Sequence, residues 1–176
     1  IREALSSRED LSSYTGKILL PYCLGVLSDI YYARNRYQEA QRISRTSLNI
    51  MLQDSLLEFS YTDSLARAKT REAHARNLMA LERWQQALDQ FELISKELAT
   101  DPTTFQLRFE NDPDRGFAML MAGKPERALA LFDRALSNRL EHFGSNDGRV
   151  LEISAYRAMA LGAAGGRNHE ALTLFD

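Results

Sequence analysis

The sequence predicts an all-α fold: a right-handed superhelical α-solenoid of antiparallel helix pairs, with about four repeats of which the last is incomplete. Three observations support this prediction. A short phrase recurs along the chain, and each copy places apolar residues at helical spacing. No stretch of useful length alternates between apolar and polar residues with a period of two, so we expect no sheet.

The recurring phrase is clearest in residues 124–136, KPERALALFDRAL, and it returns in residues 36–48, 83–95 and 167–176. Each copy has an alanine at the same position, and these alanines are separated by 47, 41 and 43 residues: Ala40, Ala87, Ala128 and Ala171. A period in this range indicates stacked repeats. An alanine in the middle of an apolar stripe lets another helix approach closely.

A second helical stretch precedes each copy, in residues 22–33, 63–81, 115–123 and 150–166. Turn residues separate the two stretches at Asn35-Arg36, Gly123-Lys124 and Gly165-Gly166. The repeating unit is therefore a helix, a turn and a helix. Residues 109–115, FENDPDR, lack the ligand ladder of a calcium loop, so we interpret Pro113 as a helix kink or start.

We expect the whole chain, residues 1–176, to form a single helical repeat domain with repeats at about 17–60, 61–100, 101–143 and 147–176. Residues 1–16 are predicted to be the end of a preceding helix and a linker. The chain starts at Ile1 rather than at a methionine, and it stops within a helical pattern. We therefore interpret it as a fragment of a longer protein.

The composition is that of a globular domain, with 44% hydrophobic and 26% charged residues. The formal net charge of −2 gives no reason to expect nucleic acid or a membrane as partner. No apolar run approaches the roughly 20 residues that span a bilayer. The single cysteine, Cys23, excludes an internal disulfide framework and fits a reducing compartment, so we expect a cytoplasmic location.

The sequence predicts no catalytic, cofactor-binding or metal site, and hence no enzyme. Cys23 lies in an apolar helical stretch, where we expect a buried thiol that behaves as a small hydrophobe. The histidines His74, His142 and His169 fall in different repeats, and no two are spaced as metal ligands on one helix. The glycines near residue 165 form no phosphate-binding motif.

The order of small, aromatic and alanine positions resembles the tetratricopeptide repeat (TPR). The matching residues, by unit, are Tyr31, Tyr37 and Ala40; Trp84, Ala87 and Phe91; Gly116, Gly123, Ala128, Phe132 and Ala135; and Gly166, Ala171 and Phe175. Ser44 and Ser47 depart from the pattern, since apolar residues are usual there. The long period, with Phe143, Gly144 and Val150 in a connector, is similar to the TPR arrays of kinesin light chains and CHAT-type caspase-like proteases.

The resemblance implies that the first helix of each unit lines a concave groove for a peptide or a partner helix. Carrying the pattern over residue by residue gives the candidate groove residues Tyr22, Asp29, Tyr32, Lys69, Glu72, Arg76, Met79, Phe117, Met121, Tyr156 and Arg157. A clamp for a terminal carboxylate, as in TPR co-chaperones, is not expected. Asp29 stands at a clamp position and would repel a carboxylate.

The expected function is a protein- or peptide-binding scaffold that uses this groove and has no catalysis of its own. One alternative is a regulatory or sensor segment of a larger enzyme, such as a CHAT-type caspase-like protease. Another is the sensor part of a transcription regulator. Homo-oligomerisation is a further possibility, because a truncated solenoid exposes apolar end faces.

Overall fold

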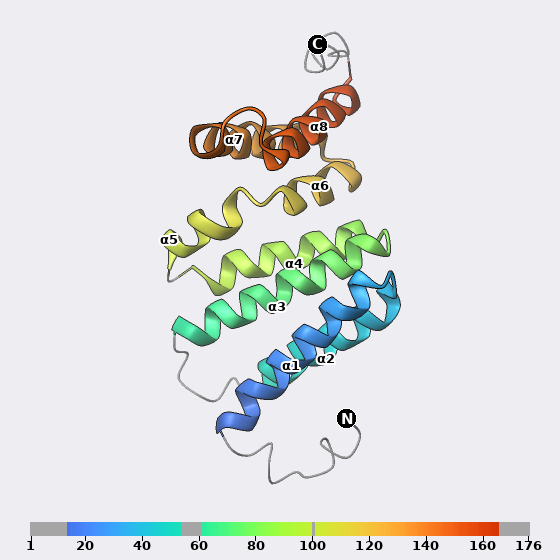
Figure 1. Ribbon diagram of the computed structural model, residues 1–176, viewed down its shortest axis with the longest axis vertical. Helices are drawn as coiled ribbons and strands as arrows, with labels where there is room; N and C mark the ends of the chain where they lie inside the picture. The colour runs from blue at the N-terminus through green and yellow to red at the C-terminus, as the bar shows by residue number, and fades with distance from the viewer. Residues whose placement is uncertain (1–13, 54–60, 100, 166–176) are drawn as a thin grey trace.

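The computed structural model describes residues 14–53, 61–99 and 101–165, and the structure of the remaining residues is not described. Within these ranges all the regular elements are helices. They stack as successive pairs along the long axis of the molecule, with α1 and α3 in front of α2 and α4 (Figure 1). The prediction of an all-α solenoid is confirmed. No helix in the described ranges is long and apolar enough to cross a membrane.

Each helix pair packs on the next one mainly through a second helix, since α2 contacts α3, α4 contacts α6 and α7 contacts α8. The elements of the first two pairs are α1 (Tyr14–Ala33), α2 (Tyr37–Gln53), α3 (Tyr61–Ala80) and α4 (Trp84–Glu97). The later elements are α5 (Pro102–Phe105), the π-helix η2 (Gln106–Glu110), α6 (Pro113–Met121), α7 (Pro125–Phe143) and α8 (Gly148–Ala163). The fourth copy of the repeated phrase, residues 167–176, lies outside the described residues.

The turns within the first three pairs share one backbone geometry. Asn35, Glu82 and Gly123 all have positive φ, at 57°, 58° and 74°. In each turn the next residue donates its N–H, at 2.9 Å, to a carbonyl five residues earlier: Arg36 to Tyr31, Arg83 to Leu78 and Lys124 to Met119. This is the Schellman arrangement that ends a helix. The sequence indicated the turns at Asn35 and Gly123 but not the one at Glu82, because glutamate seldom adopts positive φ.

The first helix of the third unit is interrupted before α6. Asp112 caps the new helix, since its Oδ1 accepts a hydrogen bond of 3.0 Å from the backbone N–H of Asp114. Pro113 then occupies the first turn of α6, where a missing N–H costs nothing. The expected helix start at Pro113 is confirmed, and it separates α6 from η2.

The core follows the alanines that the repeats share. Ala40, Ala87 and Ala128 each have a relative exposure of 0%, so second helices touch their neighbours at these points. From α3 to α8 one continuous cluster of apolar side chains fills the interior, with Phe91 and Phe132 as its largest members. Close packing of this kind fixes the spacing of the first helices, and with it the shape of the face that they form.

Candidate functional site

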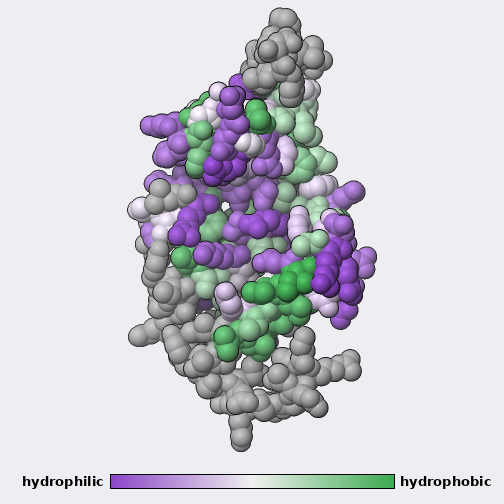
Figure 2. All heavy atoms as spheres, viewed as in Figure 1, coloured by the Kyte–Doolittle hydropathy of each residue, from purple (hydrophilic) through white to green (hydrophobic). Residues whose placement is uncertain are grey.

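The exposed side of the first helices α1, α3, α6 and α8 forms one surface, which we call the first-helix face. Figure 2 shows this face, with an apolar band over α1. Among the side chains of α1 that the structure describes, five large apolar ones are exposed: Leu19 at 56%, Tyr22 at 69%, Val26 and Ile30 at 45%, and Tyr32 at 39%. Several exposed apolar side chains on one helix are typical of a contact site.

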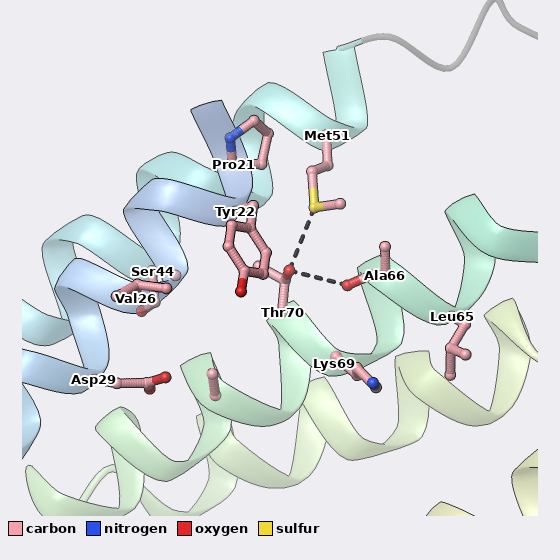
Figure 3. A pocket seen from close by; sticks show the side chains of 12 residues that line it. Pro21, Tyr22, Val26, Asp29, Ser44, Met51, Leu65, Ala66, Lys69 and Thr70 are labelled. Atoms are coloured by element: carbon pink, nitrogen blue, oxygen red, sulfur yellow. Dashed lines mark hydrogen bonds between the residues drawn. The ribbon is translucent and has the colours of Figure 1, made fainter. Parts of the chain in front are cut away.

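A cavity of about 520 Å³ opens between α1 and α3 on this face (Figure 3). Its walls are Tyr22, Gly25, Val26 and Asp29 from α1, and Leu65, Ala66, Lys69, Thr70 and Ala73 from α3; Pro21, Ser44 and Met51 complete it. Small residues create the space. A Cβ added at Gly25 would meet nothing within 4 Å, so the cavity owes part of its volume to that missing side chain.

Hydrogen bonds hold the helices around the cavity. Ser47 donates its hydroxyl to the carbonyl of Pro21 at 2.9 Å, which fastens α1 to α2. The Thr70 hydroxyl lies 3.0 Å from the carbonyl of Ala66 and 3.3 Å from the sulfur of Met51 (Figure 3). These contacts fix the walls before any ligand binds, so the cavity is preformed.

A buried polar network lies beneath the cavity and joins three helices. Asn77 of α3 donates from Nδ2 to the hydroxyls of Ser28 in α1 and Ser44 in α2, at 2.9 and 3.0 Å. Ser28 in turn donates to the carbonyl of Ala40 at 3.0 Å, and Ser44 lies 2.8 Å from Nδ1 of His74. Burial, with lesser effects of nearby arginines, lowers the pKa of His74 to about 4. The imidazole is therefore neutral at physiological pH and can take part in the network without a buried charge.

Further along the same face, carboxyl groups of α3 and α6 gather around one arginine, and a carboxyl group of α8 acts on one of them. Arg76 of α3 pairs with Glu72 of its own helix, and its Nε lies 3.0 Å from Asp114 Oδ2 of α6. Burial raises the pKa of Asp114, while Arg76 lowers it and Glu152 of α8 raises it again. The side chains of Glu72 and Asp114 are 22% and 35% exposed, so this cluster is open to a ligand.

Asp112 adds to the cluster a carboxyl group that is poorly solvated and incompletely hydrogen-bonded. Burial raises its pKa to about 7, and the neighbouring charges of Asp114 and Glu72 add to the rise, while Arg76 opposes it. Its Oδ2 is buried and has no hydrogen-bond partner. A carboxyl group held in this way loses solvation without gaining a full set of partners.

A group of aromatic rings lies where α6 meets α8 on the first-helix face. Phe117 of α6 lies edge-on to Trp84, with 5.8 Å between ring centroids, and 4.9 Å from the ring of Tyr156 in α8. The hydroxyl of Tyr156 donates to Glu152 Oε1 at 3.0 Å. Burial and this hydrogen bond raise the pKa of Tyr156 to about 12, so the phenol stays protonated and remains a donor.

None of the eleven groove residues predicted from the sequence is fully buried. Tyr22, Asp29 and Lys69 line the cavity, Glu72 and Arg76 belong to the carboxylate cluster, and Tyr32, Phe117 and Tyr156 lie beside it. The remaining three residues belong to neither the cavity nor the carboxylate cluster. Met79 packs partly against the core, Met121 lines a hollow near the turn at Glu82, and Arg157 pairs with Asp133 of α7 at 2.5 Å.

Sequence reasoning missed Ala73, Asp114 and Glu152 as parts of this surface, and it considered Gly25 only as a position of a carboxylate clamp. Gly25 and Ala73 contribute by being small, which a search for chemically distinctive residues overlooks. Asp114 and Glu152 belong to helices of different repeats, and only the stacking brings them near each other. The signal that could have found all four is their place on the outward side of first helices.

The expectation of a buried cysteine is wrong: Cys23 is exposed. The apolar character of α1 suggested burial, but α1 covers α2 with only one of its sides, and Cys23 lies on another. Within the described residues no group of three or more His, Cys, Asp or Glu side chains is arranged to hold a metal ion.

Comparison with known proteins gives matches among solved structures. Two crystal structures of nearly identical TPR-like repeats of a kinesin light chain-type protein from Podosopora anserina superpose with TM-scores of 0.67 and 0.66. The sequences are 19% and 18% identical, and in both cases the match covers 99% of this chain and 77% of the other. The chain has a TPR-like repeat fold. No protein-family profile matches the chain. No curated protein sequence matches it either.

The likeness confirms the TPR resemblance at the level of the fold. At this level of identity it says nothing of binding partners, so the function of this chain has to be argued from its own surface.

Proposed function

We propose that this chain is a protein-binding scaffold that holds a peptide segment of its partner on the first-helix face and performs no catalysis of its own. The observation that carries the proposal is the preformed apolar cavity between α1 and α3. Its size is within the range of small-ligand and side-chain pockets. TPR-like repeats, as stacked solenoids, present an extended surface suited to such partners.

The cavity suits an apolar side chain better than a polar one. Its walls are mainly aliphatic and aromatic, and its charged residues, Asp29 and Lys69, are both exposed. Moving a Leu or Phe side chain from water into such a space yields about 1.5–3 kcal/mol. Because the walls are held by hydrogen bonds in the free protein, little ordering cost opposes that gain.

A regulatory role within a larger enzyme or transcription regulator stays a prediction. It would use the same surface, with the bound segment supplied by another protein or by another part of the same chain.

The test is to select binding peptides from a displayed library of random dodecapeptides and to measure their affinities for two glycine variants. Gly25→Leu places a side chain in the cavity, where a new Cβ meets nothing within 4 Å. We expect the affinity of selected peptides to fall at least tenfold. Gly148→Leu is the matched control, because Gly148 is exposed at the start of α8 and is equally unobstructed.

Circular dichroism melting of both variants checks that the fold is retained. The proposal would be overturned if no peptide bound with a dissociation constant below about 1 mM. It would also be overturned if the selected peptides bound equally well to wild type and to Gly25→Leu.

A further inference from the structure

The carboxylate cluster lies next to the cavity along the same helices. In α1, Tyr32 follows Asp29 of the cavity wall by three residues, and in α3, Arg76 follows Ala73 by three. The pKa of Tyr32 is raised by burial, by Tyr37 and by the charge of Asp114, and it is lowered by Arg76, so these groups act on one another. A segment bound in the cavity and continuing toward α6 would therefore run into the cluster.

The cluster contains more negative than positive charge. Glu72 and Asp114 pair with Arg76, the half-buried carboxyl group of Asp112 lies near them, and Glu152 of α8 acts on Asp114. Two further arginines, Arg108 and Arg139, line a hollow of about 210 Å³ with Glu72 and Asp112 and do not line the cavity, so the part of the cluster without a nearby second arginine is Asp114 and Glu152. Glu152 is exposed and Asp114 partly so, which leaves both accessible from the first-helix face.

Two of these carboxyl groups, Asp112 and Asp114, occupy electrostatically unfavourable positions in the free protein. Asp114 carries a raised pKa although it contacts an arginine, because burial outweighs that contact. Perturbed groups of this kind on a surface open to ligands are common at functional sites. A cationic group placed against Asp114 and Glu152 would add a favourable charge contact to the Arg76 pairing of Asp114 and the Tyr156 hydrogen bond of Glu152.

We propose that the segment held by the first-helix face carries a Lys or Arg side chain that lies against Asp114 and Glu152, a few residues from the apolar side chain that enters the α1–α3 cavity. This inference rests on the proposed function and names the chemistry of the partner. Neighbouring helices lie about 8–10 Å apart, and an extended chain advances about 3.3 Å per residue. The cavity and the Asp114–Glu152 pair are two helix spacings apart, about 16–20 Å, so the apolar and cationic side chains are about five to six residues apart.

The choice of a cation follows from charge complementarity across the surface. An acidic segment would place a further negative charge beside Asp114 and Glu152, and like charges at close range oppose binding. A wholly apolar segment would bury part of the cluster without providing a partner for it, which costs free energy. A segment with both side chains avoids these costs.

The experiment uses a positional-scanning library of N-acetylated, C-amidated octapeptides, so that no terminal charge contributes. We expect selection of Leu, Ile, Phe or Met at one position and of Lys or Arg at a fixed distance from it. The best Lys peptide should bind at least tenfold more tightly than the same peptide with norleucine in place of Lys. That difference should shrink when salt is raised from low to moderate concentration.

Protein variants assign the preference to the cluster. Glu152→Gln removes a charge and keeps an acceptor for the Tyr156 hydroxyl, and the double variant Glu152→Gln with Asp114→Asn removes two charges. The single variant should lower the affinity for the Lys peptide by about threefold or more, and the double variant by about tenfold or more. Neither variant should change the affinity for the norleucine peptide. The control Glu141→Gln removes an exposed carboxylate of α7 and should change neither.

The possible failures can be told apart. If peptides bind and Gly25→Leu blocks them, but no Lys or Arg is selected, this inference fails and the proposed function stands. Selection of Asp or Glu would overturn it in the same way. An equal loss for the Lys and norleucine peptides in Glu152→Gln would show a structural effect rather than a charge contact. If no peptide binds at all, the proposed function itself fails.

Discussion

Two glycines in first helices mark two regions of the solenoid that are built differently. A Cβ at Gly25 in α1 would meet nothing within 4 Å, whereas a Cβ at Gly116 in α6 would lie 2.5 Å from Cε1 of Phe132. The space beside Gly25 opens into the cavity, and the space beside Gly116 is filled by the Phe132 ring. One residue type therefore leaves a pocket in the first unit and permits close helix packing in the third.

The buried contacts of the two regions differ as well. Between α1, α2 and α3 the interior holds hydroxyl, amide and imidazole groups, with Asn77 at the centre. Between α4, α6 and α7 it is filled by apolar side chains such as Phe91, Leu131 and Phe132. Hydrogen bonds define positions at a modest net gain, while apolar packing supplies most of the stability. The region with the cavity is thus positioned precisely, and the central region provides the rigid support.

The largest expected effect is that of Phe132→Ala, in the closely packed region. Phe132 has a relative exposure of 0% and packs against Gly116 and Tyr156. Its truncation should lower the free energy of unfolding by about 3–5 kcal/mol, measured by urea denaturation. Leu151→Ala, at a residue that is 57% exposed, should change it by less than about 0.5 kcal/mol. A small effect at Phe132 would contradict the contrast between the two regions.

The second largest expected effect is the pH dependence of the unfolding free energy that comes from His74, in the polar network between α1, α2 and α3. The pKa of His74 is about 4 in the folded protein, below the 6.5 that is usual for a solvated imidazole. Between these values the unfolded chain binds a proton and the folded chain does not, so stability falls as the pH falls from about 6.5 to 4. The loss from this group is up to about 3 kcal/mol.

The raised pKa of Asp112, about 7, changes stability in the opposite direction over the whole of that range, so the contribution of His74 has to be isolated with a variant. His74→Gln keeps a group that can bond to Ser44 and removes the titration. The difference in unfolding free energy between wild type and this variant should depend on pH between about 4 and 6.5 and be constant above about 7. A difference that did not change with pH would show that His74 is solvated in the folded state.

The smallest expected effects are those of alanine at the two glycines, and they should have opposite signs. Gly116→Ala forces a methyl group against Phe132 and should destabilise the protein by about 1–3 kcal/mol. Gly25→Ala adds a methyl group in open space within a helix and should stabilise it by about 0.5–1 kcal/mol. Thermal melting of the two variants side by side measures both. Equal signs would mean that the two sites do not differ in packing.

Much of the fold could be predicted from local patterns. The spacing of Ala40, Ala87 and Ala128 gave the repeat and the buried face, and all three are fully buried. The turns at Asn35 and Gly123 and the helix start at Pro113 followed from residue types with strong backbone preferences. Glu82 shows where that approach stops. It adopts the same positive φ because the flanking helices require a turn there, against its own preference.

The candidate site could be predicted only in part. The eleven first-helix positions named from the sequence are all at least partly exposed, although Met79, Phe117 and Tyr156 also pack against the core. Their grouping into a cavity and a carboxylate cluster was not foreseen. Ser44 is instructive, since it departs from the repeat pattern and yet is buried at 1% exposure. Its partners, His74 and Asn77, come from another repeat, so no local pattern could show that its hydroxyl would be satisfied.

Helical periodicity, turn residues and repeat length are local properties of the chain, so a stack of helix pairs could be inferred from them before the fold was known. The cavity beside Gly25, the exposure of Cys23 and the closeness of Glu152 to Asp114 follow instead from how the helices pack. Space and charge on a surface depend on the distances between helices. Those distances are set by the packing of side chains that lie far apart in the sequence.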